Sequence, residues 1–435
     1  MAHILADVTV STGFIILAYI AIAAAGIVIF IALFGPGLRY KITATDPADN
    51  GSDRFLGTVE ALTDSKVNRS TELVVLTNGP CFYEEELRAI SAAKRSVCLE
   101  AYIFQEGEIA KRYVDALTER ARAGVTVLVA LDALGSLKTS ERYFREYKAA
   151  GGKLAWYNPA RWYKLPRYDN RTHRELLIVD GEVGFIGGAG IADQWYKERP
   201  NHPRWRDTMV RVVGPAVRHL QATFAENWLE SCGDVLVGQE FFPENAPKAN
   251  SEHEVLVISS SPSSGGSTRA RILFQLLIAS AKKTIHINTP YFLPDKSLSD
   301  ELVRAVERGV EVSVVVPGRK SDLWLTRSSS RRGYGKLLKA GARIWEYEPA
   351  MIHAKVMLID GLWGVVGSTN CDYRSFGLND EVNLAARDPE FVERLEKDFV
   401  ADVAHSREIT YDEWRKRNIF ERAPELFGWV LERQQ

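Results

Sequence analysis

The sequence predicts an α/β protein made of two similar domains in tandem, preceded by one apolar helix. Two long stretches share one order of apolar runs and amphipathic segments, and helices alternating with β-branched runs are typical of α/β layers. The chain of 435 residues is also too long for one ordinary core. We therefore expect a first domain over residues 71–242 and a second domain over residues 251–420.

The apolar helix is expected near the N-terminus, where the run from Gly13 to Phe34 holds no charged residue. As a helix this run would be roughly 33 Å long, which is enough to cross a bilayer. A cleaved signal peptide would need a basic residue before a shorter apolar run, and the first ten residues contain neither Lys nor Arg. We therefore expect a retained transmembrane anchor over residues 13–35. The positive-inside rule places the larger part in the cytoplasm, from three following basic residues, Arg39, Lys41 and Arg54.

Three segments are expected to lie outside the two domains. Residues 36–70 are polar and rich in turn formers, which predicts a juxtamembrane linker. The segment from Pro243 to Glu254 is expected to form the seam between the domains. Residues 421–435 are expected to form a short amphipathic helix, for which packing on its own domain is favoured over membrane contact.

Charge and cysteine content exclude some classes of protein. Lys+Arg 55 against Asp+Glu 56 lacks the basic excess of a chain that binds nucleic acid electrostatically. The four cysteines show neither CxxC spacing nor a pairing pattern, so a zinc site and a disulfide framework are both disfavoured. We expect these cysteines to be reduced and mostly buried: Cys81, Cys98, Cys232 and Cys371.

Each copy of the repeat ends in the same way, with a histidine, a strand and an Asp-Gly turn. The two sets are His173 with Asp180 and His353 with Asp360. A single histidine is more often an ordinary core or surface residue. Two histidines at matching places in two repeats reverse that preference. The aspartates head hairpin signals, so we assign them structural roles.

The second copy carries the fuller set of chemical groups. His353 and Lys355 are two apart in a strand-like run, so both side chains share one face. An imidazole that can attack phosphorus, beside an ammonium that holds nonbridging oxygens, suits a phosphate ester. Ser368 and Asn370 would add neutral donors from a tight turn. Glu381 is a carboxylate expected to orient His353 and to hold its tautomer.

The second-copy motifs also resemble a known superfamily. The pattern His-x-Lys-x-x-x-x-Asp from His353 to Asp360, followed by GSTN and NDEVN, resembles the signature of the phospholipase D superfamily. TPYFLPD, RGVEVSVVVPGRKSD and YRSFGLNDEVNL are similar to segments of bacterial cardiolipin synthases. The resemblance covers nearly all of residues 70 to 420. It implies two α/β/α domains, each a mixed sheet flanked by helices, which are related by a pseudo-two-fold axis and need no metal.

The first copy departs from that pattern at two positions. Glu175 stands where the lysine is expected, and Gly190 takes the place of Asn370. A carboxylate about 4 Å from a phosphate oxygen would cost on the order of 4 kcal/mol at an effective dielectric near 20, unless a cation intervened. Glu175 could instead pair with His173 and favour its protonated form. We therefore expect His353 to be the nucleophile and His173 to be the general acid and base.

A third carboxylate, Asp207, is a candidate in the first copy for the part that Glu381 plays in the second. An ordinary salt bridge with a neighbouring arginine is the alternative reading of this residue.

Two segments could handle the substrate. Residues 156–168 mix aromatic and basic side chains, which suits a bilayer interface with anionic headgroups and could also stack on nucleic acid bases. The expected anchor favours lipid. Arg331 lies in a second basic segment that could cover the phosphate, with an exposed helix start as the alternative.

The resemblance implies a phosphatidyltransferase of the bacterial inner membrane that acts on phosphatidylglycerol through a phosphohistidine, without a cofactor. Its expected partners are anionic phospholipid and the bilayer, with no nucleic acid. Hydrolysis of the phospholipase D type, or another phosphodiesterase activity, is the near alternative because water could replace the acceptor alcohol. A degenerate lipid-binding protein is the alternative of another class, suggested by Glu175 and Gly190.

Overall fold

The computed structural model describes residues 12–34, 40–43, 49–159, 169–200, 202–245, 247, 253–262 and 268–418. The chain divides into two compact units, Met1–Leu38 and Arg39–Gln435. The first unit contains helix α1 (Thr12–Phe34). Within the described residues, no helix combines the length and the apolar character needed to cross a bilayer. The expected transmembrane anchor is not confirmed.

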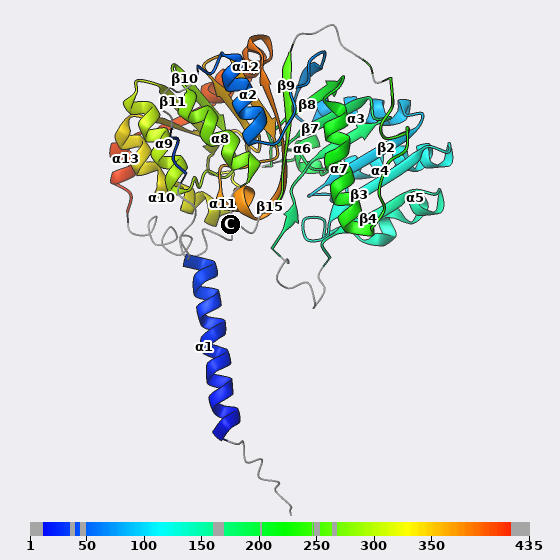
Figure 1. Cartoon of the computed structure of the whole chain (residues 1–435), viewed down its shortest axis with the longest axis horizontal. Coiled ribbons are helices and arrows are strands. Elements are labelled where there is room, and N and C mark those ends of the chain that lie inside the picture. The colour runs from blue at the N-terminus through cyan, green and yellow to red at the C-terminus, as the bar shows by residue number, and fades with distance from the viewer. Residues whose placement is uncertain are drawn as a thin grey trace, which may run out of the picture. The chain divides into compact units, whose positions relative to one another are not determined.

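The second unit contains two mixed sheets, one from each copy of the repeat (Figure 1). The first sheet has seven strands in the order β1-β8-β7-β6-β2-β3-β4. Strands β2, β3 and β4 run parallel to one another, and the other neighbours are antiparallel. The strands are β1 (Glu72–Thr77), β2 (Ser96–Ala101), β3 (Thr126–Asp132), β4 (Lys153–Tyr157), β6 (Leu176–Val179), β7 (Val183–Gly187) and β8 (Thr208–Val213).

The second sheet repeats this order as β9-β15-β14-β13-β10-β11-β12, with the same parallel and antiparallel pairs. Its strands are β9 (Glu254–Ser260), β10 (Thr284–Asn288), β11 (Glu311–Pro317), β12 (Arg343–Tyr347), β13 (Val356–Ile359), β14 (Trp363–Gly367) and β15 (Asn379–Arg387). Two further strands join its margins, β16 (Ser406–Ile409) on β12 and β5 (Arg171–Thr172) on β15. The predicted duplication is thus confirmed strand by strand.

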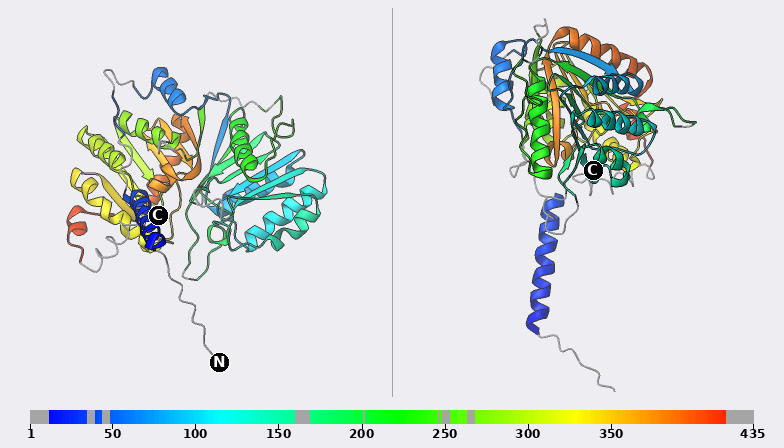
Figure 2. Two further views of the ribbon diagram at one scale, coloured as in Figure 1. Left: turned by 60° about the horizontal axis from the view of Figure 1, so that its bottom comes forward. Right: turned by 90° about the vertical axis from the view of Figure 1, so that its right-hand side faces the viewer.

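Helices pack on both faces of each sheet (Figure 2). The first half contains α3 (Gly79–Ala92), α4 (Glu108–Arg122), η1 (Glu141–Phe144), α5 (Arg145–Ala149), α6 (Asp193–Tyr196) and α7 (Val217–Cys232). The second half contains α8 (Arg269–Ser280), α9 (Lys296–Glu307), α10 (Trp324–Ala340), α11 (Tyr373–Gly377), α12 (Pro389–Ala404) and α13 (Tyr411–Arg415). Their sequences explain their placement. In α4, for example, Ile109, Tyr113 and Leu117 recur every four residues and are all buried against the sheet.

The Asp-Gly turns have the structural role that the sequence predicts. Asp180 and Asp360 adopt left-handed backbone angles, with φ of 56° and 57°. Each carboxylate accepts backbone N–H groups where the neighbouring strand begins. The donors are Lys94, Arg95 and Ser96 for Asp180, and Lys282, Lys283 and Thr284 for Asp360. Each aspartate therefore ties its hairpin to the start of the neighbouring strand, β2 or β10.

The structure corrects the predicted linker over residues 36–70. Asp53–Leu62 forms helix α2, and its residues Phe55, Leu56 and Val59 are buried in the core of the second half. The ring of Phe55 lies 5.9 Å from that of Trp363. The apolar spacing within a polar segment was the missed signal. The cysteines divide evenly, because Cys98 and Cys371 are buried whereas Cys81 and Cys232 are exposed. The expected helix over 421–435 and residues 160–168 lie outside the described residues.

The two halves share one core. A single hydrophobic cluster joins residues of α7 and the first sheet to residues of α12 and the second sheet. The contacts are reciprocal, because α12 packs on β1 and α7 packs on the matching strand β9. Buried arginines cross the same boundary: Arg174 donates to Ser259 Oγ at 2.8 Å, and Arg206 donates to Asp402 Oδ1 at 2.9 Å. This rigid boundary positions the candidate site.

Candidate active site

His173 is held by residues of the second half. Strand β5 runs beside the start of β15, so the backbone N–H of His173 donates to Asp380 O at 2.9 Å. The next residue along β15 is Glu381, and both of its carboxylate oxygens lie 3.1 Å from His173 Nδ1. The Tyr102 ring and the imidazole meet in a T-shaped contact, with the ring centroids 5.3 Å apart.

His353 is held in the same manner by residues of the first half. Its backbone N–H donates to Arg206 O at 2.7 Å, and its Nδ1 lies 3.0 Å from Asp207 Oδ2. The same Asp207 oxygen accepts the indole N–H of Trp195 at 3.0 Å. His353 and both carboxylates are buried.

The structure therefore corrects the expected pairing of histidines and carboxylates. Glu381 bonds to His173 rather than to His353, and Asp207 bonds to His353 rather than to His173. The physical reason is that each histidine segment crosses to the other half and pairs with the backbone just before that half's carboxylate. The reciprocity is that of an isologous interface, in which the same contact occurs twice.

The pKa values follow from this arrangement. Burial lowers the pKa of His353, Lys355 lowers it further, and Asp207 opposes both. His353 is therefore neutral near pH 7. Burial alone would raise the pKa of Asp207 and of Glu381. Their hydrogen bonds to the histidines and the nearby positive charge outweigh burial, so both carboxyl groups have lowered pKa values. With Nδ1–H donating to a carboxylate, Nε2 of His353 keeps its lone pair.

Lys355 converges on His353, as the two-residue spacing predicts. Its Nζ lies 2.7 Å from Nδ1 and 3.1 Å from Nε2 of His353, and it donates to His353 O at 2.8 Å. It also reaches into the first half, to Gly188 O at 3.4 Å. Burial lowers the pKa of this lysine, whereas Asp207, Glu381 and Glu175 raise it. Lys355 thus interacts with carboxyl groups from both halves of the unit.

A continuous path of contacts joins the two histidines. Lys355 pairs through its backbone with Gly367, and the adjacent Ser368 donates its hydroxyl to Glu381. Ser368 thereby positions the carboxylate that holds His173. Asn370 is buried nearby, and its Oδ1 has no hydrogen-bond partner among the described residues. These groups can activate a nucleophilic imidazole, hold an anion and move a proton.

Comparison with known proteins identifies the family of the chain. The family described as "Cardiolipin synthase, PLD-like domain" matches residues 87–228 and 275–403. The chain belongs to this family. It is 33% identical to cardiolipin synthase 1 of Bacillus cereus over 400 residues, which are 90% of this chain and 78% of the relative. It is 34% identical to the major cardiolipin synthase ClsA of Bacillus subtilis over 363 residues, 82% of this chain and 74% of the relative.

This cardiolipin synthase relative is accordingly a phosphatidyltransferase of the phospholipase D superfamily. A solved structure supports the fold. The phosphatidylserine synthase of Haemophilus influenzae matches with a TM-score of 0.64 at 15% identity, covering 87% of this chain and 96% of that one.

Within this cardiolipin synthase fold, Glu175 caps the backbone. Its Oε1 accepts the N–H groups of Tyr102 at 3.2 Å and Ile103 at 3.5 Å. Burial raises the pKa of Glu175 well above its usual value, against these hydrogen bonds and Lys355. The suggested pairing of Glu175 with His173 is not found, because Glu381 is the carboxylate bonded to that histidine.

The second half has Asn370 at the position of Gly190, and the space around Gly190 explains the difference. A Cβ at this position would lie 2.6 Å from Ile103 O and 3.2 Å from Glu175 Oε1, so an asparagine has no room. Strand pairing aligns Tyr102 with Pro290, which has no N–H to donate. In the first half Glu175 caps two amides at this place, and Gly190 leaves room for its carboxyl group.

Arg331 is not beside the histidines. Its guanidinium pairs with buried Glu346 at 3.1 Å, and its carbonyl accepts the indole N–H of Trp414 at 2.6 Å. The expectation that Arg331 covers the phosphate is therefore not supported. Its side chain joins α10 to β12 instead.

Sequence reasoning missed the residues that support the histidines from behind. Tyr291 lies 6.4 Å from His353, ring to ring, as Tyr102 lies against His173. Asp132 accepts the N–H of Thr172 at 3.2 Å and so fixes the backbone just before His173. The available signal was a tyrosine shortly after the matching strand in each repeat, Tyr102 after β2 and Tyr291 after β10.

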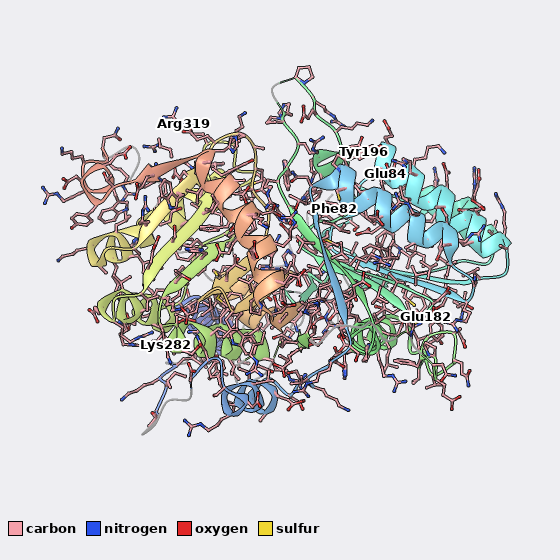
Figure 3. The ribbon with its side chains drawn as sticks, turned by 90° about the horizontal axis from the view of Figure 1, so that it is seen from above. Phe82, Glu84, Glu182, Tyr196, Lys282 and Arg319 are labelled. Atoms are coloured by element: carbon pink, nitrogen blue, oxygen red, sulfur yellow. The ribbon has the colours of Figure 1, made fainter. Side chains whose placement is uncertain are left out.

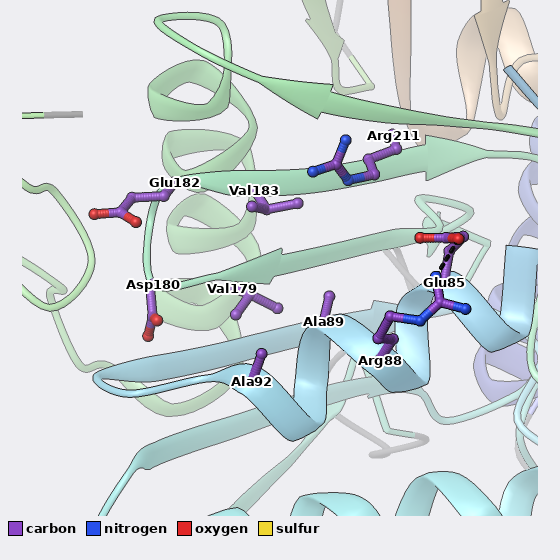
Figure 4. Close-up of a pocket in the computed structure, with 9 residues that line it drawn as sticks. All are labelled: Glu85, Arg88, Ala89, Ala92, Val179, Asp180, Glu182, Val183 and Arg211. Atoms are coloured by element: carbon purple, nitrogen blue, oxygen red, sulfur yellow. Dashed lines mark hydrogen bonds and ion pairs between the residues drawn. The ribbon is translucent and has the colours of Figure 1, made fainter. Parts of the chain in front are cut away.

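A surface pocket of about 270 Å³ in the first half lies away from this site (Figure 4). Asp180 reaches it, but that carboxylate is already bonded to backbone amides. Among the described residues, no group of three or more His, Cys, Asp or Glu side chains is arranged to hold a metal ion. The histidine pair remains the candidate active site of this family member.

Proposed function

We propose that this enzyme makes cardiolipin from two molecules of phosphatidylglycerol, through a phosphohistidine on His353. The observation that carries the proposal is the crossed pair of imidazoles, in which His353 is neutral, hydrogen-bonded at Nδ1 to Asp207 and touched by Lys355. The two Bacillus relatives, which bear the name cardiolipin synthase, support the choice of product.

In the first step, Nε2 of His353 attacks the phosphorus of one phosphatidylglycerol. The new P–N bond replaces the P–O bond to the terminal glycerol, which leaves with a proton from His173. Lys355 offsets the negative charge that gathers on the nonbridging oxygens, where a positioned cation stabilises the transition state. Glu381 stabilises the protonated His173 before this transfer.

In the second step, His173 takes the proton of a hydroxyl on a second phosphatidylglycerol. That oxygen attacks phosphorus, the P–N bond breaks, and His353 returns to its neutral form. The net products are cardiolipin and glycerol. Water in the acceptor's place would give phosphatidic acid, so transfer requires a site that admits the lipid alcohol and excludes water.

We also propose that α1 anchors the enzyme in the bacterial inner membrane, with the second unit in the cytoplasm. Its uncharged sequence and the basic residues that follow support this topology. Protease added outside sealed spheroplasts should leave the second unit intact, and cleavage there would reverse the orientation.

The test of the function uses the full chain in vesicles of phosphatidylglycerol. Cardiolipin and glycerol should form in equal amounts with the wild type and should not form with His353→Ala. A matched control is His286→Ala, because His286 pairs with Glu396 on α12 and not with the site. Phosphatidic acid as the main product would replace the transferase by a hydrolase. If the wild type forms no product, the result would favour the alternative of a degenerate lipid-binding protein.

A further inference from the structure

The strongest unexplained feature of the second unit is a pair of exposed apolar loops. The first loop (residues 134–138) follows β3 and exposes Leu134 and Leu137, whose exposed fractions are 38% and 74%. The second loop (residues 319–324) follows β11 and exposes Leu323 at 50% and Trp324 at 67%. Among the described residues, Trp324 is the one tryptophan classed as exposed.

The two loops occupy matching places in the two halves. Strands β3 and β11 are equivalent, because each lies next to the matching strand, β2 or β10, and runs parallel to it. Single exposed apolar residues are common on soluble proteins and carry no meaning by themselves. Apolar pairs at the same place in both copies of a repeat are a different case, because neither pair is covered by its own domain.

The first loop is fastened directly to the candidate active site. Ser136 donates its hydroxyl to Tyr102 O at 2.9 Å, and the Tyr102 ring lies against His173. The N–H groups of Leu134 and Gly135 donate to Asp132, the carboxylate that also fixes the residue before His173. Leu137 therefore follows directly after a loop segment that is hydrogen-bonded to residues around His173.

The second loop is fastened to the other histidine in a similar manner. The Tyr291 hydroxyl donates to Asp322 Oδ2 at 2.7 Å, and the Tyr291 ring lies against His353. Leu323 and Trp324 follow immediately in the chain. Figure 3 shows Arg319, at the start of this loop, on the opposite edge of the second half from Lys282, which precedes β10.

We propose that these two loops insert into the surface of an anionic bilayer and hold the mouth of the active site against it. Leu and Trp suit this place because apolar side chains enter the acyl boundary and tryptophan prefers the interface. Each loop also exposes a basic residue, Lys138 or Arg319, that would attract anionic headgroups. The inference rests on the proposed function, since only a lipid substrate needs the site at a bilayer.

The test measures contact with lipid rather than turnover. In full-length protein with the exposed cysteines removed (Cys81→Ser and Cys232→Ser), a single cysteine is placed at Leu137→Cys or Trp324→Cys and labelled with an environment-sensitive fluorophore. The protein is reconstituted into vesicles of phosphatidylglycerol and phosphatidylcholine. Part of the phosphatidylcholine carries a nitroxide quencher on its acyl chain.

The matched control is Val237→Cys, an aliphatic position with 79% exposure. Its segment lies at the opposite end of the strands from the first loop, because Ser96, at the start of β2, bonds to Glu240 O, whereas the loop follows the end of β3. Labels at 137 and 324 should both lose most of their fluorescence to the quencher, and the label at 237 should keep it. Quenching at neither loop, at one loop alone, or equally at 237 would overturn the proposal.

A second copy of the chain on these loops would also overturn it. That occupant would shield the labels from aqueous iodide in detergent, without quenching by the lipid nitroxide. His353→Ala separates the two proposals, because it should abolish product and leave the quenching unchanged. Quenching at both loops in a wild type that forms no cardiolipin would support the docking surface and contradict the proposed reaction.

Discussion

The two halves have the same strands in the same order, yet they treat the lysine position in opposite ways. In the second half, Lys355 reaches across the boundary to Gly188 O while touching His353. In the first half, Glu175 turns to the backbone and caps two amides. The histidines and their carboxylates remain reciprocal, whereas the cation is present once. A shared site needs both imidazoles, but one buried cation can serve it from one side.

The largest expected effect tests the reciprocal part of this comparison. Asp207→Asn should lower kcat by about 10³–10⁴-fold, because an amide cannot hold the His353 tautomer or offset its positive charge. Glu381→Gln should cause a loss of the same order through His173. The crossed pairing is checked by measuring the two reaction steps separately. Asp207→Asn should slow formation of the phosphoenzyme, as His353 variants should. A defect confined to the second step would contradict the crossed pairing.

Because the two halves differ at the lysine position, substitutions at Lys355 and at Glu175 should reduce kcat by different amounts. Lys355→Met should reduce kcat by about 10²–10³-fold, the usual cost of removing one group that stabilises transition-state charge. Glu175→Gln should change kcat by less than about tenfold, because the amide oxygen can still accept from Tyr102 and Ile103. Kinetics on phosphatidylglycerol vesicles check both. Equal losses would mean that Glu175 acts on the phosphate.

Restoring the lysine in the first half should harm the protein rather than improve it. Glu175→Lys leaves two part-buried amides without an acceptor, at up to about 1–3 kcal/mol each, and adds a charge near Lys355 at a buried position. The free energy of unfolding should fall by a few kcal/mol, seen as a lower midpoint in urea. Gly190→Asn should also destabilise, because its Cβ meets Ile103 O. A more active and equally stable Glu175→Lys variant would contradict the capping role.

The smallest effect is a shift of the acid limb of the pH profile. Attack requires neutral His353, whose pKa lies below the ordinary 6.5, so phosphoenzyme formation should weaken only below that pH. Lys355 is one cause that lowers this pKa, so Lys355→Met should move the limb to higher pH. Asp207 raises the pKa, so Asp207→Asn should move the limb to lower pH. Shifts of the opposite sign would refute this electrostatic account.

The sequence predicted what depends on local patterns. Repeated apolar runs predicted two similar α/β halves, the Asp-Gly spacing predicted the turns at Asp180 and Asp360, and period two placed Lys355 beside His353. The crossed pairing could not be predicted, because its partners lie 208 residues apart for His173 and Glu381 and 146 apart for His353 and Asp207. Each carboxylate was assigned to the histidine of its own half, and only the packing of the two sheets decides otherwise.

The role of Glu175 was hidden for a related reason. Its spacing marks a departure from the lysine pattern but does not show that Tyr102 and Ile103 present two free amides where the second half has Pro290. Helix α2 was missed because three apolar residues in a polar segment resemble a linker until their partner, the core around Trp363, is known.

The most direct test of the central claim is to trap the phosphorylated enzyme and map the labelled residue. Phosphatidylglycerol with a labelled phosphate is mixed briefly with the full-length protein, and acid-labile phosphate is located by peptide mapping at neutral to alkaline pH. The account predicts label on His353, unchanged in His173→Ala and absent from His353→Ala. Label on His173 in the wild type would contradict it and exchange the roles of the two halves.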